Sequence, residues 1–301
     1  MYRSVLVPLD GSAFGEHALP YALELARRGV PSIRIVHVHV PPSALDMEGL
    51  TPYQFEGVPE YAADAEVRQE ESGYLECVLR RVPEELRSRV TAEVVDGPVV
   101  PRLEAYAREA QADLVVMTTH GRTGLSRAWL GSVADGLVRR LSMPVLLLRP
   151  SGEESEEPTA GGFRHVLVAL DGSRLAEQIL EHAIGIGVEG ETAYTLVRVV
   201  TRSTRRQEPG RLEAQEQEAQ AYLDRIAGTL RMEGINVRTR VAVYAHPALG
   251  IIEEARQQGA DLIALATHGR GGLVRLVLGS VADKVLRGTT LPILLYRPRE
   301  G

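Results

Sequence analysis

Three stretches of this sequence occur twice, and this internal repeat constrains the fold more than any other feature. Residues 7–12 (VPLDGS) recur at 168–173 (VALDGS), an offset of 161 residues. Residues 119–122 (THGR) and 130–135 (LGSVAD) recur at 267–270 and 278–283, both at an offset of 148. A repeat this long is a whole domain, because a solenoid repeat contains only one supersecondary unit. The sequence therefore predicts two homologous domains.

The two offsets differ, so the first half is longer than the second. It carries an extra 13 residues between its second expected strand and the turn Asp96–Gly97–Pro98. Between the halves, residues 151–163 are acidic and rich in glycine and serine, which is typical of a flexible linker. We expect a first domain at 1–150, a linker at 151–163 and a second domain at 164–301.

Short apolar runs alternate with longer amphipathic ones in each half. In the first half the pattern predicts strands at 4–9, 33–40, 91–95, 114–118 and 145–148, and helices at 13–28, 62–79, 101–110 and 131–141. Strands that alternate with helices form parallel sheets with right-handed crossovers. The expected fold class is α/β, with two repeated open parallel five-stranded sheets, Rossmann-like, and helices on both faces.

The last expected strands, 145–148 and 293–296, are short and apolar. An unpaired apolar edge strand invites pairing with another strand. We expect these two strands to pair with each other inside one chain, and a further homodimer is left open.

Composition excludes several classes of protein. The net charge of −6 provides no positive field for nucleic acid, and the single cysteine, Cys77, cannot form an internal disulfide or a multi-thiolate metal site. No stretch approaches the roughly 20 apolar residues of a membrane span, and the first residues lack the apolar core of a signal peptide. We expect a cytoplasmic protein without nucleic-acid or membrane partners.

Two segments of each half fall at the carboxyl ends of the expected strands, where open parallel sheets bind ligands. One is Asp10–Gly11–Ser12, repeated at Asp171, and the other is a glycine-rich loop that ends at Gly131–Ser132 as a helix begins. A helix N-terminus offers N–H groups and a positive dipole end, so phosphate is the natural ligand. The loop is neither a Walker A nor a Rossmann glycine motif. An ordinary turn and a loop without ligand remain the alternatives.

Both halves resemble the universal stress protein family, whose nucleotide-binding members carry the motif G-x2-G-x9-G-[S/T]. Gly121, Gly131 and Ser132 fit the later part of the motif, and Gly269, Gly279 and Ser280 fit it in the second half. Both halves depart from it at the first glycine, which is Thr118 in one and Ala266 in the other. The resemblance covers nearly the whole chain and implies a fold like that of the adenine nucleotide alpha hydrolases.

The resemblance implies that ATP, or ADP or AMP, binds in each half, with Mg²⁺ as a further component. Asp10 and Asp171 would lie beside the adenine or ribose, the backbone near Val38 and Val199 would contact the adenine edge, and the glycine loops would wrap the ribose and phosphates. Because Gly97 becomes Ala245 and the first motif glycine becomes Ala266, the second site is the weaker candidate. The expected nucleotide-contacting residues are Pro8, Asp10, Val38, Gly97, Thr118, His120, Gly121, Arg122, Gly131, Ser132 and Val133 in half one, and Asp171, Val199, Ala266, His268, Gly269, Arg270, Gly279, Ser280 and Val281 in half two.

Three functions fit these observations. The first is a nucleotide-responsive stress or regulatory module that an unknown protein partner reads. The second is a slow ATPase or nucleotidyl transferase, although the sequence shows no loop lysine, acidic metal pair or Ser/His/Asp set. We therefore assign no catalytic residue and no metal ligand. His120 and His268 are interpreted as hydrogen-bonding loop residues rather than bases, and Cys77 as structural rather than a nucleophile. The third is an interaction scaffold that binds no nucleotide.

Overall fold

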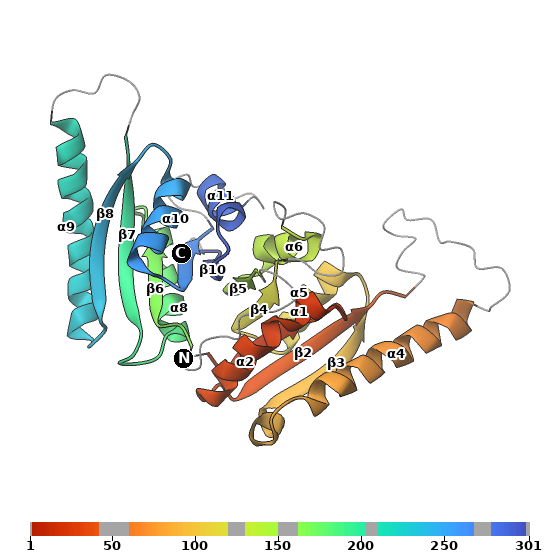
Figure 1. Ribbon diagram of the computed structural model, residues 1–301. Coiled ribbons are helices and arrows are strands. Elements are labelled where there is room, and N and C mark those ends of the chain that lie inside the picture. Colours follow the sequence, from red (N-terminus) through yellow and green to blue (C-terminus); the bar gives the residue numbers. More distant parts are fainter. Residues whose placement is uncertain are drawn as a thin grey trace.

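The computed structural model describes residues 2–41, 60–119, 130–149, 162–202, 210–267 and 278–298, with only the backbone described at 60–63. In this part of the chain the strands form one ten-stranded sheet, with strand order β3-β2-β1-β4-β5-β10-β9-β6-β7-β8. Helices cover both sides of the sheet (Figure 1). The expected α/β class is confirmed.

The described elements of the first half alternate as the sequence predicts. They are β1 (Ser4–Pro8), α1 (Ala13–Glu16), α2 (Ala18–Arg27), β2 (Ser32–His39), α4 (Glu60–Arg80), the 3-10 helix Glu84–Arg89, β3 (Val90–Asp96), α5 (Val99–Glu109), β4 (Leu114–Thr118), α6 (Ser132–Arg140) and β5 (Val145–Leu148).

The second half repeats this order without the 3-10 helix. Its described elements are β6 (His165–Ala169), α7 (Arg174–Glu177), α8 (Ile179–Ile186), β7 (Ala193–Thr201), α9 (Arg211–Met232), β8 (Val237–Tyr244), α10 (Pro247–Gln258), β9 (Leu262–Ala266), α11 (Ser280–Gly288) and β10 (Ile293–Tyr296).

Within each half the strands are parallel, and the first strand lies between the second and the fourth. β1 pairs with β2 on one side and with β4 on the other, and β6 is flanked in the same way by β7 and β9. The strand order therefore reverses between β1 and β4 and between β6 and β9. These are the topological switch points at which open α/β sheets bind ligands.

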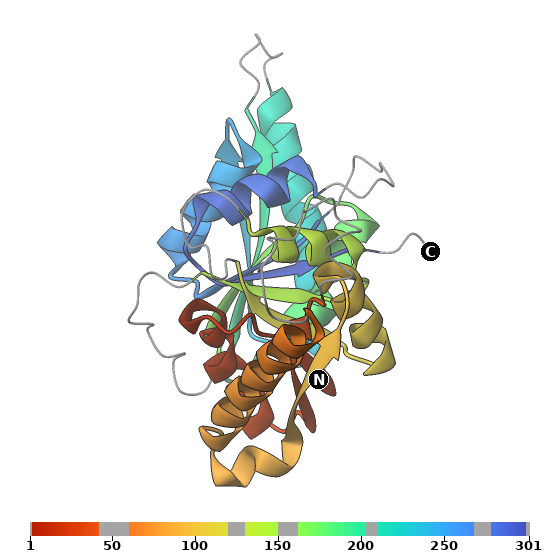
Figure 2. The same ribbon diagram turned by 90° about the vertical axis from the view of Figure 1, so that its right-hand side faces the viewer.

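The two halves join through their last strands, as the sequence predicts. β5 and β10 pair antiparallel, with Leu146 opposite Leu294. These two leucines are equivalent at the offset of 148, so a local pseudo-twofold axis passes between them. The halves lie on either side of this strand pair (Figure 2).

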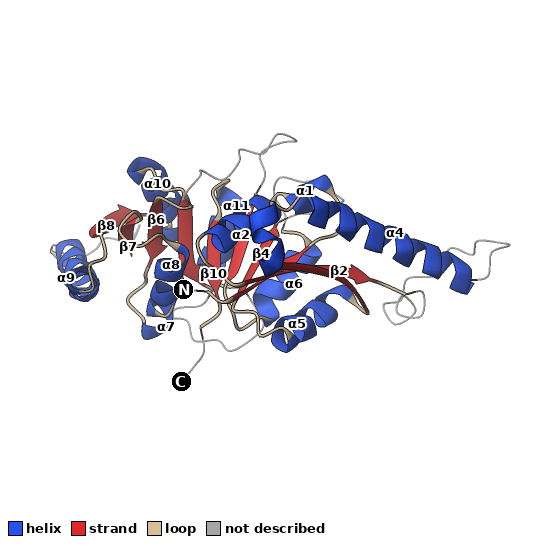
Figure 3. Cartoon of the chain, turned by 90° about the horizontal axis from the view of Figure 1, so that it is seen from below, coloured by secondary structure: helices blue, strands red, loops and turns tan. Residues whose placement is uncertain are grey.

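Two apolar cores run along the sheet, one on each face. One core includes α2 and α4 of the first half together with α8 and α9 of the second, and the other includes α5, α6, α10 and α11. Both cores cross from one half to the other without interruption. α4 and α9 lie toward opposite ends of the sheet (Figure 3).

The predicted helix over 13–28 is wrong in one respect, because it is two helices that meet at His17. The second half breaks at the equivalent Gln178. Pro20 follows the first break, but the second half has Glu181 at that place, so the break comes from the shared path of the chain rather than from a proline. Gly29 has a φ of +102°, in keeping with its predicted role after the helix.

Candidate functional site

Asp10 follows β1 and organises the turn into the first helix. Its Oδ1 accepts hydrogen bonds from the Ser12 backbone N–H at 3.1 Å and from the Ser12 hydroxyl at 2.6 Å. The Ser12 Oγ accepts from the Gly15 N–H at 3.0 Å and thereby caps α1. Gly11, with a φ of +81°, makes the tight turn. The carboxylate of Asp10 is thus fixed at the carboxyl end of the sheet.

The second half builds the same turn. Asp171 Oδ1 accepts from the Ser173 N–H at 2.9 Å and from the Ser173 hydroxyl at 2.6 Å. Ser173 Oγ accepts from the Ala176 N–H at 3.1 Å, and Gly172 has a φ of +90°. Chemistry that depends on Asp10 is therefore available to Asp171.

The N-terminus of α6 lies at the same edge of the sheet. The Gly131 N–H donates to the Thr119 carbonyl at 2.8 Å, and the first intrahelical bond runs from the Asp135 N–H to the Gly131 carbonyl at 2.9 Å. The N–H groups of Ser132, Val133 and Ala134 precede that bond, and no side chain of the described residues caps them. An uncapped helix N-terminus with a positive dipole end favours an anion.

α11 begins in the same way. The Gly279 N–H donates to the Thr267 carbonyl at 3.0 Å, and no described side chain caps the helix that starts at Ser280. Gly131 and Gly279 both have a φ of −59°, with ψ values of 149° and 145°. Val133 and Val281 occupy the second position of their helices and are half-buried.

Strand register places the aspartate turn beside the helix N-terminus in each half. Leu6 pairs with Val115, so Asp10 comes level with Thr119, whose carbonyl holds Gly131. In the second half Ala169 pairs with Leu265, which brings Asp171 level with Thr267. Each half therefore brings a carboxylate and a helix N-terminus together at its switch point. Pro8 ends β1 and is half-buried.

The ends of β2 and β7 lie at the same carboxyl edge of the sheet as the aspartate turns. Val38 pairs with Val95 in β3, and Val199 pairs with Ala242 in β8. Gly97 has a φ of +136°, and its N–H donates to the His39 carbonyl at 3.0 Å. The second half has Ala245 in the corresponding turn. This turn therefore differs between the halves.

Two further expected site residues lie at strand ends, where the sequence places them, and others lie outside the described residues. Thr118 and Ala266 end β4 and β9, and the Thr118 side chain is buried. The residues that lie outside the described part of the chain are His120, Gly121, Arg122, His268, Gly269 and Arg270. The same holds for most of the linker and for 42–59, where the extra residues of the first half fall.

The aspartates that follow the glycine motifs have local partners. Asp135 pairs with Arg139 at 2.7 Å, and Asp283 pairs with Arg287 at 2.9 Å, one turn along the same helix. This hydrogen bond raises the pKa of Arg139 above its ordinary value, and Arg287 is raised in the same way. These pairs stabilise α6 and α11. Cys77 is a free, exposed thiol.

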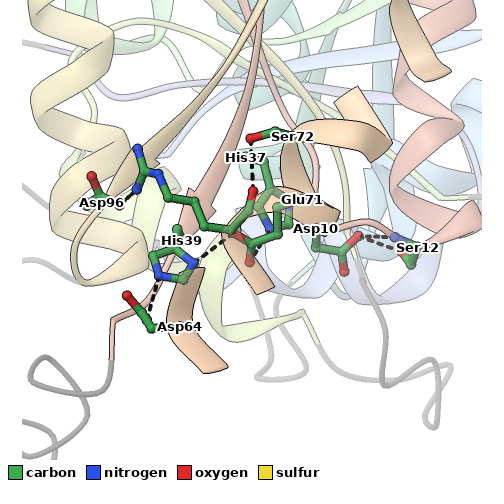
Figure 4. Close-up of polar contacts among 9 residues, drawn as sticks. Asp10, Ser12, His37, His39, Asp64, Glu71, Ser72 and Asp96 are labelled. Atoms are coloured by element: carbon green, nitrogen blue, oxygen red, sulfur yellow. Dashed lines mark hydrogen bonds and ion pairs between the residues drawn. The ribbon is translucent and has the colours of Figure 1, made fainter. Parts of the chain in front are cut away.

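Sequence reasoning missed a set of polar side chains behind the Asp10 turn. His37 and His39 project from β2 toward α4 and contact Asp64 and Glu71 on that helix (Figure 4). Next to them, burial and the nearby Glu16 raise the pKa of Tyr74 well above its ordinary value. The alternation His37–Val38–His39 in an apolar strand was the available signal, because it places both rings on one face.

The family of the chain follows from comparison with known proteins. The model of the universal stress protein family matches residues 1–149 and 162–297. The chain belongs to this family and carries its domain twice.

Two relatives match nearly the whole chain, and a third protein matches about half of it. A universal stress protein of Mycobacterium tuberculosis is 29% identical over 98% of this chain and 97% of its own length. The crystal structure of a universal stress protein from Archaeoglobus fulgidus covers 99% of this chain and 97% of that chain, with 20% identity and a TM-score of 0.70. Another universal stress protein, solved in complex with cAMP, covers 46% of this chain and 99% of that chain, with 20% identity and a TM-score of 0.36.

Among the described helices, none combines the length and the apolar character that a membrane crossing requires.

Proposed function

We propose that this chain binds adenine nucleotides, ATP or else ADP or AMP, at two sites, one at the switch point of each half. The observation that carries the proposal is the paired arrangement: each half sets an anchored aspartate turn beside an uncapped helix N-terminus. In both halves the helix N-terminus carries the Gly–Ser end of the motif found in the nucleotide-binding members of the family.

Different residues of each site would contact the phosphates, the ribose and the adenine. The N–H groups of Ser132 and Val133, with the Ser132 hydroxyl, are suited to phosphate oxygens, and Ser280 and Val281 provide the same groups in the second half. Asp10 and Asp171 are suited to ribose hydroxyls, which donate to carboxylates. The backbone at Val38 and Val199 would accept and donate along the adenine edge, and Mg²⁺ would accompany ATP.

In this proposal nucleotide occupancy is the signal. A ligand that binds only the folded chain stabilises it by RT ln(1 + [L]/Kd), about 2.7 kcal/mol at a hundredfold excess over Kd. A partner protein in the cytoplasm would then distinguish the liganded chain from the empty one. Binding and release suffice for this role, and no turnover is part of it.

Calorimetric titration of the nucleotide-free chain with MgATP tests the proposal. We expect two sites per chain. Asp10→Asn and Asp171→Asn keep an acceptor for the serine contacts but remove the charge, so each should weaken one site about tenfold or more. Asp113→Asn is the matched control, because Asp113 also accepts backbone N–H groups, at 2.7 Å from Arg3 and 3.0 Å from Ser4, but lies at the amino ends of the strands.

The outcomes separate the alternatives. One site, lost in Asp10→Asn alone, would show that only half one binds nucleotide. Absence of heat and of any thermal shift with MgATP, MgADP and AMP would overturn the proposal in favour of an interaction scaffold. We expect phosphate release to stay at background over hours, and sustained release would establish an ATPase instead.

A further inference from the structure

The end of β2 and the facing side of α4 carry a cluster of ionisable side chains in which the two histidines are buried and the two carboxylates are half-buried. His37, His39, Asp64 and Glu71 form this histidine–carboxylate cluster (Figure 4). The His39 Nδ1 lies 2.8 Å from Glu71 Oε2, and its Nε2 lies 3.0 Å from Asp64 Oδ1. The His39 side chain is only 3% exposed, whereas Glu71 is 16% and Asp64 28% exposed, so water screens the contact with Glu71 less than the contact with Asp64. His39 thus joins the end of a strand to two carboxylates of one helix.

The contacts of His39 determine how many protons His39, Asp64 and Glu71 must share. Ionised carboxylates only accept hydrogen bonds, and a neutral imidazole has a single N–H. Because both ring nitrogens of His39 lie within hydrogen-bond distance of carboxylate oxygens, the second contact needs a second proton. That proton resides on the ring, as imidazolium, or on one of the two carboxyl groups. Either way, the trio of His39, Asp64 and Glu71 binds one proton beyond the neutral-histidine state.

His37 is the second histidine of the cluster and also contacts Glu71. His37 Nε2 lies 3.2 Å from the other oxygen of Glu71, and His37 Nδ1 is buried with no hydrogen-bond partner in the described structure. The ring of His37 meets that of Tyr74 edge-on, with centroids 6.2 Å apart.

Other charged groups frame the site. On α4, Arg68 forms an ion pair with Asp96 at the end of β3. From the side of β1, Asp10 acts electrostatically on Tyr74. The ionisable groups around the histidines and Tyr74 in the described structure therefore include Asp10, Glu16, Asp64, Arg68, Glu71 and Asp96.

We propose that the histidine–carboxylate cluster is a proton-binding site that holds α4 on β2 and releases it as the pH rises. When the proton leaves, a ring lone pair and a carboxylate oxygen face each other about 3 Å apart. Two acceptors at that distance repel, so Asp64 or Glu71 must withdraw. Both residues belong to α4 and lie two turns apart on one face, so their withdrawal loosens the part of the helix that precedes the buried Leu75 and Val78.

The second half has the same scaffold without the titratable groups. The equivalents of His37 and His39 are Arg198 and Val200, and those of Asp64 and Glu71 are Leu212 and Ala219. The equivalence is supported by Tyr74 and Tyr222, which face Glu16 and Asp10 in one half and Glu177 and Asp171 in the other.

Arg198 stands where the first half has the titratable His37, and it carries a permanent positive charge. Its guanidinium lies over the Tyr222 ring at 5.2 Å and pairs with Glu218 at 3.3 Å. Because arginine stays charged throughout the accessible pH range, α9 has no such proton dependence. The chain thus contains its own reference helix, and the proposal does not depend on nucleotide binding.

Hydrogen–deuterium exchange of the full chain tests the proposal. Protection factors, corrected for the intrinsic exchange rate at each pH, are measured for peptides of α4 and α9 between pH 6 and pH 9. We expect the protection of α4 to fall at least tenfold relative to α9 as the pH rises. Parallel behaviour of the two helices would overturn the proposal.

The variant Glu71→Gln separates a proton site from a merely structural contact. Its amide oxygen can accept from His37, and its NH₂ can donate to Nδ1 of a neutral His39. Protection of α4 should therefore persist at high pH and lose its pH dependence. If the pH dependence survives in Glu71→Gln, the proton is bound elsewhere and the proposal is wrong.

Histidine variants and a spectroscopic readout complete the experiment. His39→Gln should abolish the pH dependence, whereas the matched control His246→Gln, an exposed histidine of half two, should leave it unchanged. In the wild-type chain the ¹⁵N shifts of the His39 ring should report its proton directly. A ring that is neutral at pH 6 and carboxyl groups that are both ionised would overturn the proposal, whatever the variants do.

Discussion

Arg149 and Arg297 occupy equivalent places after the last strands of the two halves, and each caps the last helix of the other half. Arg149 Nη1 donates to the carbonyls of Arg287 at 3.3 Å and Thr289 at 3.2 Å, at the end of α11. Arg297 Nη1 donates to the carbonyl of Arg139 at 2.6 Å, at the end of α6. The arginines therefore cross between the halves around the β5–β10 pair. A cation at a helix C-terminus also complements the dipole.

We expect Arg149→Met and Arg297→Met to lower the free energy of unfolding of the whole chain by about 1–2 kcal/mol each. The substitutions remove charge-assisted hydrogen bonds and leave helix-terminal carbonyls without their donor. Urea denaturation should show a lower midpoint with an unchanged slope.

The control is Arg80→Met, which removes a 73% exposed arginine from an i,i+4 pair with Glu76. Exposed pairs of this kind contribute about 0.5 kcal/mol or less. Equal losses in Arg80→Met and Arg149→Met would show that the crossed arginines do not join the halves.

Most of the fold could be predicted from the sequence because the repeat and the apolar alternation are local signals. The short apolar runs at 145–148 and 293–296 predicted the pairing that places Leu146 opposite Leu294. The break at His17 was not predicted, because the apolar residues from Ala18 to Ala26 follow helical spacing, although Gly15 and Pro20 lie close by. It depends on the path that the chain takes over the sheet, and this is tertiary information.

Part of the candidate site could likewise be predicted from the sequence and part could not. Asp10 and Gly131 belong to repeated motifs, and the sequence predicted where the ends of β1 and β4 would bring them. The contact of His39 with Glu71 joins residues 32 positions apart. On a charged helix, Glu71 has the pattern of a solvated residue, and only the packing of α4 on β2 makes it a half-buried partner of His39.

Gly131→Ser should separate nucleotide binding from stability. The φ of −59° at Gly131 suits any residue, and serine is a good N-cap, so stability should be unchanged or rise by a few tenths of a kcal/mol. The new hydroxyl would accept from the N–H groups that phosphate needs, and affinity at site one should fall about tenfold or more. Gly279→Ser is the matched change at site two. Unaltered affinity in both variants would remove the helix N-termini from the proposed sites.

Two helical glycines should be replaceable with a gain in stability. Gly73 in α4 and Gly228 in α9 have open space where a Cβ would lie. Alanine at either place should raise the free energy of unfolding by about 0.5–1 kcal/mol, because glycine loses more entropy on folding. Gly97→Ala should instead destabilise the chain by about 1 kcal/mol or more, since its φ of +136° is strained for any other residue. Thermal unfolding of the three variants checks the contrast.

His182 should make the junction of the halves sensitive to acid. Its ring lies 4.2 Å from that of Tyr296 and 6.4 Å from that of Tyr2, and burial lowers its pKa below the ordinary 6.5. The unfolded chain therefore binds a proton here at a higher pH than the folded chain does. Stability should fall as the pH drops below about 6.5.

His182→Gln should flatten this part of the pH profile of the unfolding free energy. Burial also lowers the pKa of His165 in the same half, so the flattening caused by His182→Gln should be partial. A wild-type profile that His182→Gln leaves unchanged between pH 7.5 and pH 5 would contradict the assignment.

The first half alone, residues 1–150, should form a symmetric dimer through β5. In the full chain Leu146 and Leu294 are both fully buried and oppose each other across the local axis. Because they are equivalent residues, a second copy of half one presents the same strand that half two supplies. An unpaired β5 would expose backbone donors and apolar side chains at the sheet edge. Sedimentation should therefore show a dimer that dissociates only at low concentration. A half that stays folded and monomeric at every concentration would show that the strand pair is not needed for its stability.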